Sequence, residues 1–128
     1  MLDENLPANQ RLLLRDWGIH FRFVSVDIAT PGTDDENLIP VLHHLPQPTF
    51  FSLDHRFGQR RWVHPSYCLV WLDVEDDHAA EFIRRFLRHP AFSTQTRRMG
   101  VVARAHADGV TFWRARQASA EAVSWPSS

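Results

Sequence analysis

Apolar positions recur with helical spacing in some stretches of the chain and with strand-like spacing in others. Leu6, Leu13 and Trp17 fall on one face of an expected first helix. Pro7 in its first turn and Gly18 just past its end fit the usual asymmetry of helix boundaries. The pattern therefore predicts a helix close to the start of the chain.

Two more helices are expected, each after polar residues that suit a helix start. Thr33 and Glu36 fit a capping box, and Pro40 would kink or split the helix that follows. Asp76 or Asp77 can cap the other helix. The residues expected to face inward are Leu38, Val41, Leu42 and Leu45 in the former helix and Ala79, Phe82, Ile83 and Phe86 in the latter.

Strand-like segments alternate with these helices. Residues 49–53 and 68–72 are almost continuously apolar, which is typical of parallel strands covered on both faces. A hairpin between residues 100 and 116 is expected around Asp108-Gly109, a strong two-residue turn signal. This alternation predicts an α/β domain with three α/β/α layers, a mostly parallel central sheet and a C-terminal β-hairpin.

The composition fits one compact domain without disulfides. The chain has 128 residues, of which 44% are hydrophobic and 23% charged, with a formal net charge of -1. We expect residues 1–118 to form this domain and residues 119–128 to be a flexible tail. Cys68 is the single cysteine, and no apolar leader or membrane-length run is evident. A cytoplasmic protein without membrane contact is therefore expected.

Acidic residues fall where the expected parallel strands end, the edge at which such sheets usually carry functional groups. Asp3 and Asp54 each end an apolar run directly. Asp73 ends the apolar run 68–72 but also fits an ordinary strand-end residue on a solvated loop, and Asp34 and Asp35 would favour a helix N-terminus without any ligand. Clustered carboxylates repel one another unless a cation neutralises them, and oxygen ligands favour Mg²⁺ or Mn²⁺. The expected metal ligands are Asp3, Asp34, Asp54 and Asp73, with Glu4, Asp35 and Glu36 as alternative acids.

All 14 basic residues are arginines, and this excludes several kinds of chemistry. A phosphate-binding loop with its lysine, Schiff-base catalysis and a lysine general base all need an amine that the chain lacks. A phosphoacceptor receiver domain has a similar spacing of acidic residues, but it uses a lysine to engage the phosphoryl group. The missing lysine therefore counts against that class of protein.

Four segments, in order along the chain, resemble a known family. Together they are similar to compact PIN-like nucleases that begin with a strand followed by Asp-Glu-Asn-Leu and are related to the VapC toxins. The four are Leu2-Asp3-Glu4-Asn5-Leu6-Pro7, Thr33-Asp34-Asp35-Glu36-Asn37-Leu38, Phe51-Ser52-Leu53-Asp54-His55-Arg56-Phe57-Gly58 and the hairpin from Val101 to Arg116.

The resemblance implies a PIN-type fold and a metal-dependent endoribonuclease, the toxin of a toxin-antitoxin system that a cognate antitoxin protein neutralises. Asp3, Asp34 and Asp54 would match the catalytic acids that bind metal. Asp73 would supply the fourth metal ligand. The implied reaction is hydrolysis of RNA phosphodiesters by water that Mg²⁺ or Mn²⁺ activates.

The chain departs from the family pattern in three places. Only Met1 and Leu2 precede Asp3, whereas the family has a longer first strand. Arg56 stands where the family commonly has a second Asp, and Pro40 falls where the family helix is continuous. These departures leave a second interpretation open, a catalytically impaired PIN-like domain that acts as a protein- or RNA-binding module.

Arginines and one aromatic residue follow Asp54 closely, and they suit RNA because guanidinium groups bind phosphate and rings stack on bases. Scattered surface arginines are also common without any ligand, and the net charge of -1 offers little steering. Trp113 or Trp125, if exposed, would mark a homodimer or antitoxin surface. The expected RNA contacts are Arg56, Arg60, Arg61 and Trp62.

Overall fold

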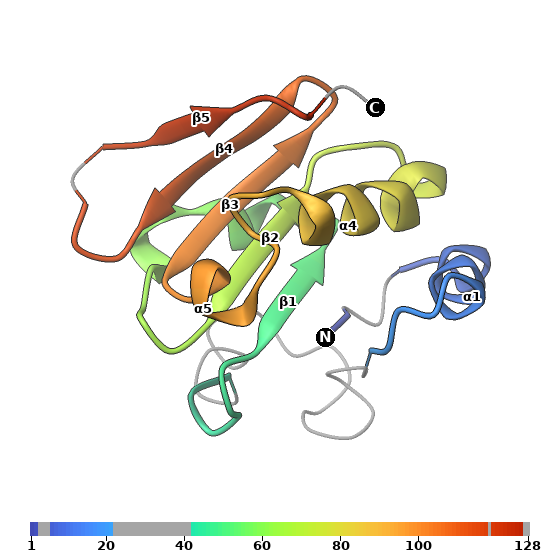
Figure 1. Cartoon of the computed structure of the whole chain (residues 1–128), viewed down its shortest axis with the longest axis horizontal. Coiled ribbons are helices and arrows are strands. Elements are labelled where there is room, and N and C mark those ends of the chain that lie inside the picture. Colours follow the sequence, from blue (N-terminus) through green and yellow to red (C-terminus); the bar gives the residue numbers. More distant parts are fainter. Residues whose placement is uncertain (3–5, 22–41, 118, 127–128) are drawn as a thin grey trace.

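The computed structural model describes residues 1–2, 6–21, 42–117 and 119–126 (Figure 1). The fold is mixed α/β, as the alternating pattern predicts. No helix in these four ranges is long and apolar enough to cross a membrane. In chain order the elements are α1 (Ala8–Asp16), β1 (Thr49–Ser52), η1 (His55–Gly58), η2 (Arg60–Trp62), β2 (Cys68–Leu72), η3 (Asp76–His78), α4 (Ala79–Arg88), α5 (Gln95–Arg98), β3 (Val101–His106), β4 (Gly109–Arg114) and β5 (Glu121–Val123), where η denotes a 3₁₀ helix.

The five strands form one sheet in the order β1-β2-β3-β4-β5. Strands β1, β2 and β3 run parallel, with Ser52 opposite Trp71 and Trp71 opposite Arg104. Strands β3, β4 and β5 are antiparallel neighbours. Leu2 adds a parallel bridge to Phe51. The expected parallel strands are confirmed, and they share the sheet with an antiparallel part that is larger than the predicted hairpin.

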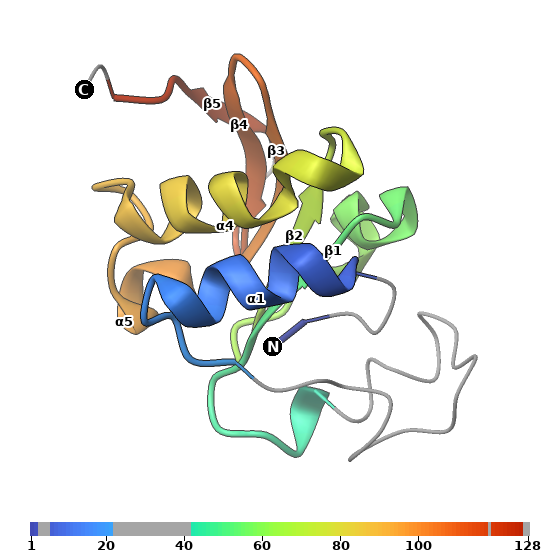
Figure 2. The same cartoon turned by 90° about the vertical axis from the view of Figure 1, so that its right-hand side faces the viewer.

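Helices α1 and α4 contact each other and cover one side of the sheet, here called the helix face (Figure 2). Phe51, Val70 and Ala103 from the three parallel strands pack there with Leu14 of α1 and Phe86 of α4. This face accounts for every second apolar position of the parallel strands. The inward face predicted for α4 is confirmed, because Ala79, Phe82, Ile83 and Phe86 are all buried.

The opposite side of the sheet, here called the turn face, is covered differently. Phe50, Leu69 and Val102 alternate with the helix-face residues and pack against Phe57 of η1 and Tyr67. Within the described ranges, the 3₁₀ helices η1 and η2 cover much of this face. The second expected helix falls largely on residues 22–41, which lie outside the described residues. Its Leu42 is buried in this second core, and Leu45 packs against it.

The N-terminal helix is confirmed, although Pro7 precedes its first turn and its buried face is only partly the predicted one. Helix α1 starts directly after Pro7, and Gly18 follows its end with φ of 76°. Leu13, expected to face inward, is 37% exposed, whereas Gln10 and Leu14 are buried. Leu6 is buried and Trp17 packs against the same core, as predicted. The prediction is wrong for Leu13 and missed the buried polar residue Gln10.

Gln10 is buried where its side chain accepts a hydrogen bond from the first turn of α4. Its Oε1 accepts the backbone N–H of Ala80 at 3.0 Å, in the first turn of α4. Such N–H groups have no partner within their own helix, so a buried one needs an external acceptor. The N-cap of α4 is His78, and no side-chain cap bond forms there, so the caps expected from Asp76 or Asp77 are wrong.

The C-terminal hairpin is confirmed, with its turn one residue earlier than predicted. His106 pairs with Gly109, so the turn is Ala107-Asp108 and Gly109 already belongs to β4. Gly109 has φ of 152°, and a Cβ there would lie 2.2 Å from the carbonyl oxygen of Val123. Glycine is needed because β5 approaches this backbone closely.

Residues expected in a flexible tail include a paired strand. Within the span 119–128, β5 pairs with β4. Trp125 then donates its indole N–H to the carbonyl of His106 at 2.7 Å and contacts the Phe82 ring. The Ser and Ala content of this segment does not reveal these contacts, because they depend on the glycine in β4 and on α4.

Candidate functional site at the carboxyl edge of the parallel strands

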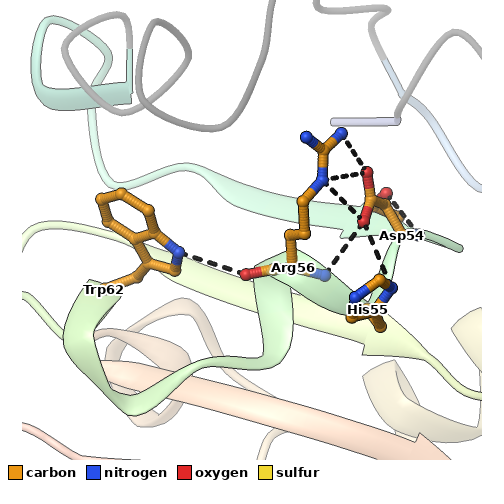
Figure 3. A network of polar contacts seen from close by, with 5 residues as sticks. Asp54, His55, Arg56 and Trp62 are labelled. Carbon is orange, nitrogen blue, oxygen red and sulfur yellow. Dashed lines mark hydrogen bonds and ion pairs between the residues drawn. The ribbon is translucent and has the colours of Figure 1, made fainter.

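Asp54 lies just beyond β1, and its side chain is 25% exposed. Its Oδ1 accepts the backbone N–H of Arg56 at 2.9 Å and so caps η1. The Arg56 guanidinium holds both carboxylate oxygens, with Nη2 2.6 Å from Oδ2 and Nε 3.1 Å from Oδ1 (Figure 3). This side-chain hydrogen bonding is the main reason why the pKa of Asp54 lies below its usual value.

Asp73 occupies the equivalent place after β2. Its backbone N–H donates to the carbonyl of Ala105 at 2.8 Å, which continues the parallel pairing past the strand end. Arg104 on β3 donates from Nε to Asp73 Oδ2 at 2.7 Å, and its Nη2 lies 2.7 Å from the same oxygen. Each carboxylate at this edge is therefore paired with an arginine. Arg104 was not predicted, although it is the polar position within an otherwise buried strand segment.

The ring of Trp71 connects the surroundings of the two carboxylates. The Trp71 ring makes an edge contact with the His55 ring, with 6.3 Å between the two centroids. Cζ of Arg104 lies 5.5 Å from the centroid of the Trp71 ring. His55 Nδ1 in turn lies 3.8 Å from Asp54 Oδ1. We call this group the carboxyl-edge cluster; it comprises Asp54, His55, Arg56, Trp71, Asp73 and Arg104.

The predicted RNA contacts follow directly on η1 and η2. Trp62 donates its indole N–H to the carbonyl of Arg56 at 3.1 Å (Figure 3). Cζ of Arg61 lies 4.4 Å from the centroid of the Trp62 ring. Arg56, Arg60 and Arg61 are exposed, whereas Trp62 is half-buried against the turn-face core. One short segment thus presents three guanidinium groups, and its aromatic ring is partly engaged in packing.

The donors for a metal ion are only partly within the described chain. Asp3, Asp34 and the alternative acids Glu4, Asp35 and Glu36 lie outside the described residues. In the remaining chain no group of three His, Cys, Asp or Glu residues is placed to hold a metal ion. Asp54 and Asp73 offer the oxygen ligands that Mg²⁺ and Mn²⁺ prefer. Because each is paired with an arginine, a cation there would compete with a guanidinium group.

Cys68 is not a candidate nucleophile. It is fully buried at the start of β2, and burial raises the pKa of its thiol to about 12. A thiol reacts as its thiolate, and this side chain stays protonated at neutral pH.

Comparison of the chain with protein-family models, with curated proteins and with solved structures finds no match in any of the three. The PIN-like resemblance therefore rests on the sequence segments that suggested it.

Proposed function

We propose that this protein is a metal-dependent endoribonuclease with a three-layer PIN-like fold, which hydrolyses RNA phosphodiesters at the carboxyl-edge cluster. One observation carries the proposal: Asp54 and Asp73 follow neighbouring parallel strands, beside an arginine-rich segment. The Trp71 ring between them contacts His55, which follows Asp54, and Arg104, which pairs with Asp73. Carboxylates in this position suit metal-assisted phosphodiester hydrolysis, and the adjacent guanidinium groups suit the charged substrate.

The residues have distinct roles in this proposal. Asp54 and Asp73 bind the cation, and on sequence grounds Asp3 and Asp34 complete the ligand set. Mg²⁺ or Mn²⁺ bound there supplies an activated water and neutralises charge on the scissile phosphate. The RNA strand is held by four residues on η1 and η2: Arg56, Arg60, Arg61 and Trp62. The biological role proposed is that of a cytoplasmic toxin with a cognate antitoxin.

The direct test is cleavage of an unstructured RNA by purified protein in Mn²⁺ or Mg²⁺. We expect Asp54→Asn to lower the rate by about 100-fold or more, because it removes one ligand charge and keeps the shape of the side chain. Asp108→Asn is the matched control, because Asp108 is exposed in the hairpin turn and should leave the rate unchanged. Equal rates for wild type and Asp54→Asn would refute the assignment, as would a wild-type protein without activity.

A binding module without catalysis is the second candidate, and the Arg56 side chain favours it. Its guanidinium occupies both oxygens of Asp54, the only described acid at the end of β1. If the chain is impaired for this reason, Arg56→Asp should create metal-dependent cleavage where the wild type has none. If the wild type already cleaves RNA, the binding-only interpretation is wrong.

A further inference from the structure

A pocket with a volume of about 400 Å³ opens between η2 and the end of β4, and of its lining residues Arg60 already belongs to the proposed RNA contacts. It brings together two segments that are far apart in sequence, one after β1 and the other comprising the end of β4 and the residues that follow it. No acidic residue is among those that line it. They are Arg60, Val63, Trp113, Arg114, Arg116 and Gln117.

The positive charge of this pocket comes from two of its arginines. Arg114 is engaged elsewhere, because its Nη1 donates to the carbonyl of Arg97 at 3.1 Å and its Nε lies 3.7 Å from Glu121. Arg60 and Arg116 are exposed, and neither forms an ion pair with any residue in the described ranges. Two guanidinium groups at one concave surface, neither paired with an acid of the described ranges, favour an anionic ligand.

The aromatic wall of the pocket is Trp113. It pairs with Val102 in the β3–β4 ladder, which places its side chain on the turn face. Its ring is partly exposed, and its indole N–H has no acceptor within the described chain, unlike those of Trp62 and Trp125. A partly exposed indole beside guanidinium groups is suited to stack on a nucleobase.

The backbone conformation of Arg116 is a second observation that indicates a binding site at this pocket. Its φ is 72°, which lies in the left-handed region that residues other than Gly, Asn and Asp rarely adopt. Glycine would relieve this strain, yet the position carries an arginine at the mouth of a pocket. Backbone strain of this kind concentrates at binding and catalytic sites.

We propose that this pocket binds one nucleotide of single-stranded RNA, with the base on Trp113 and the phosphate between Arg60 and Arg116. The inference rests on the proposed function, since the bound nucleotide would belong to the strand that is cut. It extends the RNA contacts from η1 and η2 to the loop after β4. The short chain between Asp54 and Arg60 connects the cluster to the pocket.

Binding is tested apart from cleavage by fluorescence anisotropy of a labelled, unstructured eight-nucleotide RNA in EDTA. We expect Arg60→Glu and Arg116→Glu each to weaken binding by about tenfold and to flatten its salt dependence. Arg88→Glu makes the same charge change at an exposed position on α4, across the sheet, and should change affinity little. Equal losses in all three variants would show general electrostatic attraction and would overturn the pocket.

Two further substitutions separate a ligand-binding role from a structural one. Arg116→Gly should raise the melting temperature because it relieves the positive φ, and it should still weaken RNA binding. Trp113→Phe should bind RNA better than Trp113→Ala does, because it keeps a ring. If Arg116→Gly binds RNA as the wild type does, the proposal fails.

The two proposals fail in different ways. If the wild type binds this RNA through Arg60 and Arg116 but does not cleave it in Mn²⁺, the nuclease proposal is contradicted and the pocket proposal is not. If the wild type, Arg60→Glu and Arg116→Glu all cleave RNA with the same KM, the pocket proposal alone is contradicted. Absence of RNA binding by the wild type overturns the pocket and favours a protein ligand on this face.

Discussion

The two faces of the sheet are built from the same strands but covered in different ways. On the helix face, α1 and α4 seal a core in which Phe86 is fully buried and stacks on Phe92 at 4.5 Å between centroids. On the turn face, the described residues form a smaller core that short 3₁₀ helices cover, with exposed arginines beside half-buried tryptophans.

The difference between the two coverings suggests that the helix face mainly stabilises the fold and the turn face carries the candidate functional residues. Long helices bury a broad apolar stripe and satisfy their own backbone, so they suit a sealed core. Short 3₁₀ turns reverse the chain often and place polar side chains of neighbouring residues close together. In this protein Asp54, Arg56 and Trp62 meet on such turns. We therefore expect the largest stability losses from substitutions on the helix face, and changes in ligand binding from substitutions on the turn face alone.

The largest stability effect is expected for Phe86→Ala on the helix face. Removing this fully buried ring should cost about 3–5 kcal/mol of unfolding free energy, through lost burial and the cavity that remains. Urea denaturation measures this loss, and Phe86→Leu should lose less. RNA affinity, measured on the fraction that is still folded, should not change. A matching fall in affinity would show that the two faces are not separable.

A smaller loss is expected for Gly58→Ala on the turn face. A Cβ at this position would lie 2.6 Å from Cε3 of Trp71, so η1 must shift away from the sheet. We expect a cost of about 1–3 kcal/mol and an altered tryptophan emission spectrum. Gly18→Ala is a useful comparison, because its added Cβ meets no atom within 4 Å and only its positive φ is strained. An unchanged emission spectrum in Gly58→Ala would contradict this contact.

The smallest stability effect is expected for Arg56→Gln, and it should depend on pH. Because Arg56 lowers the pKa of Asp54, the pairing stabilises the fold above the ordinary carboxyl pKa. That stabilisation should be lost as the pH falls through the lowered pKa of the folded protein. At neutral pH we expect a loss of about 0–1 kcal/mol in the variant, since the pair is partly exposed.

An NMR titration of Asp54 should show its pKa rising in the Arg56→Gln variant. The difference in unfolding free energy between the variant and the wild type should shrink as the solution becomes more acidic. A difference that grows toward low pH would contradict the pairing of Asp54 with Arg56.

Local patterns predicted the parallel strands, the inward face of α4 and the C-terminal hairpin, because each depends on residues near one another in sequence. They missed the burial of Gln10, since its acceptor role depends on α4, 70 residues further along the chain. The turn at Ala107-Asp108 was missed for a similar reason: Gly109 is needed for the approach of β5 and not for the turn itself.

The candidate site was predictable only in part. Asp54 and Asp73 could be placed because strand ends follow from apolar runs. Their partners differ in sequence distance: Arg56 is two residues from Asp54, whereas Arg104 is on the neighbouring strand β3, 31 residues after Asp73. Spacing along the chain also gave no sign that Arg60 and Trp113 line one pocket, because the two belong to separate loops and strands.

Calorimetric titration of Mn²⁺ into wild-type protein and into Arg56→Gln tests the central claim, that Asp54 is a metal ligand for which Arg56 competes. We predict tighter Mn²⁺ binding in Arg56→Gln than in the wild type, and loss of that binding when Asp54→Asn is added. Identical binding heats in the wild type, the single variant and the double variant would contradict a metal site at Asp54.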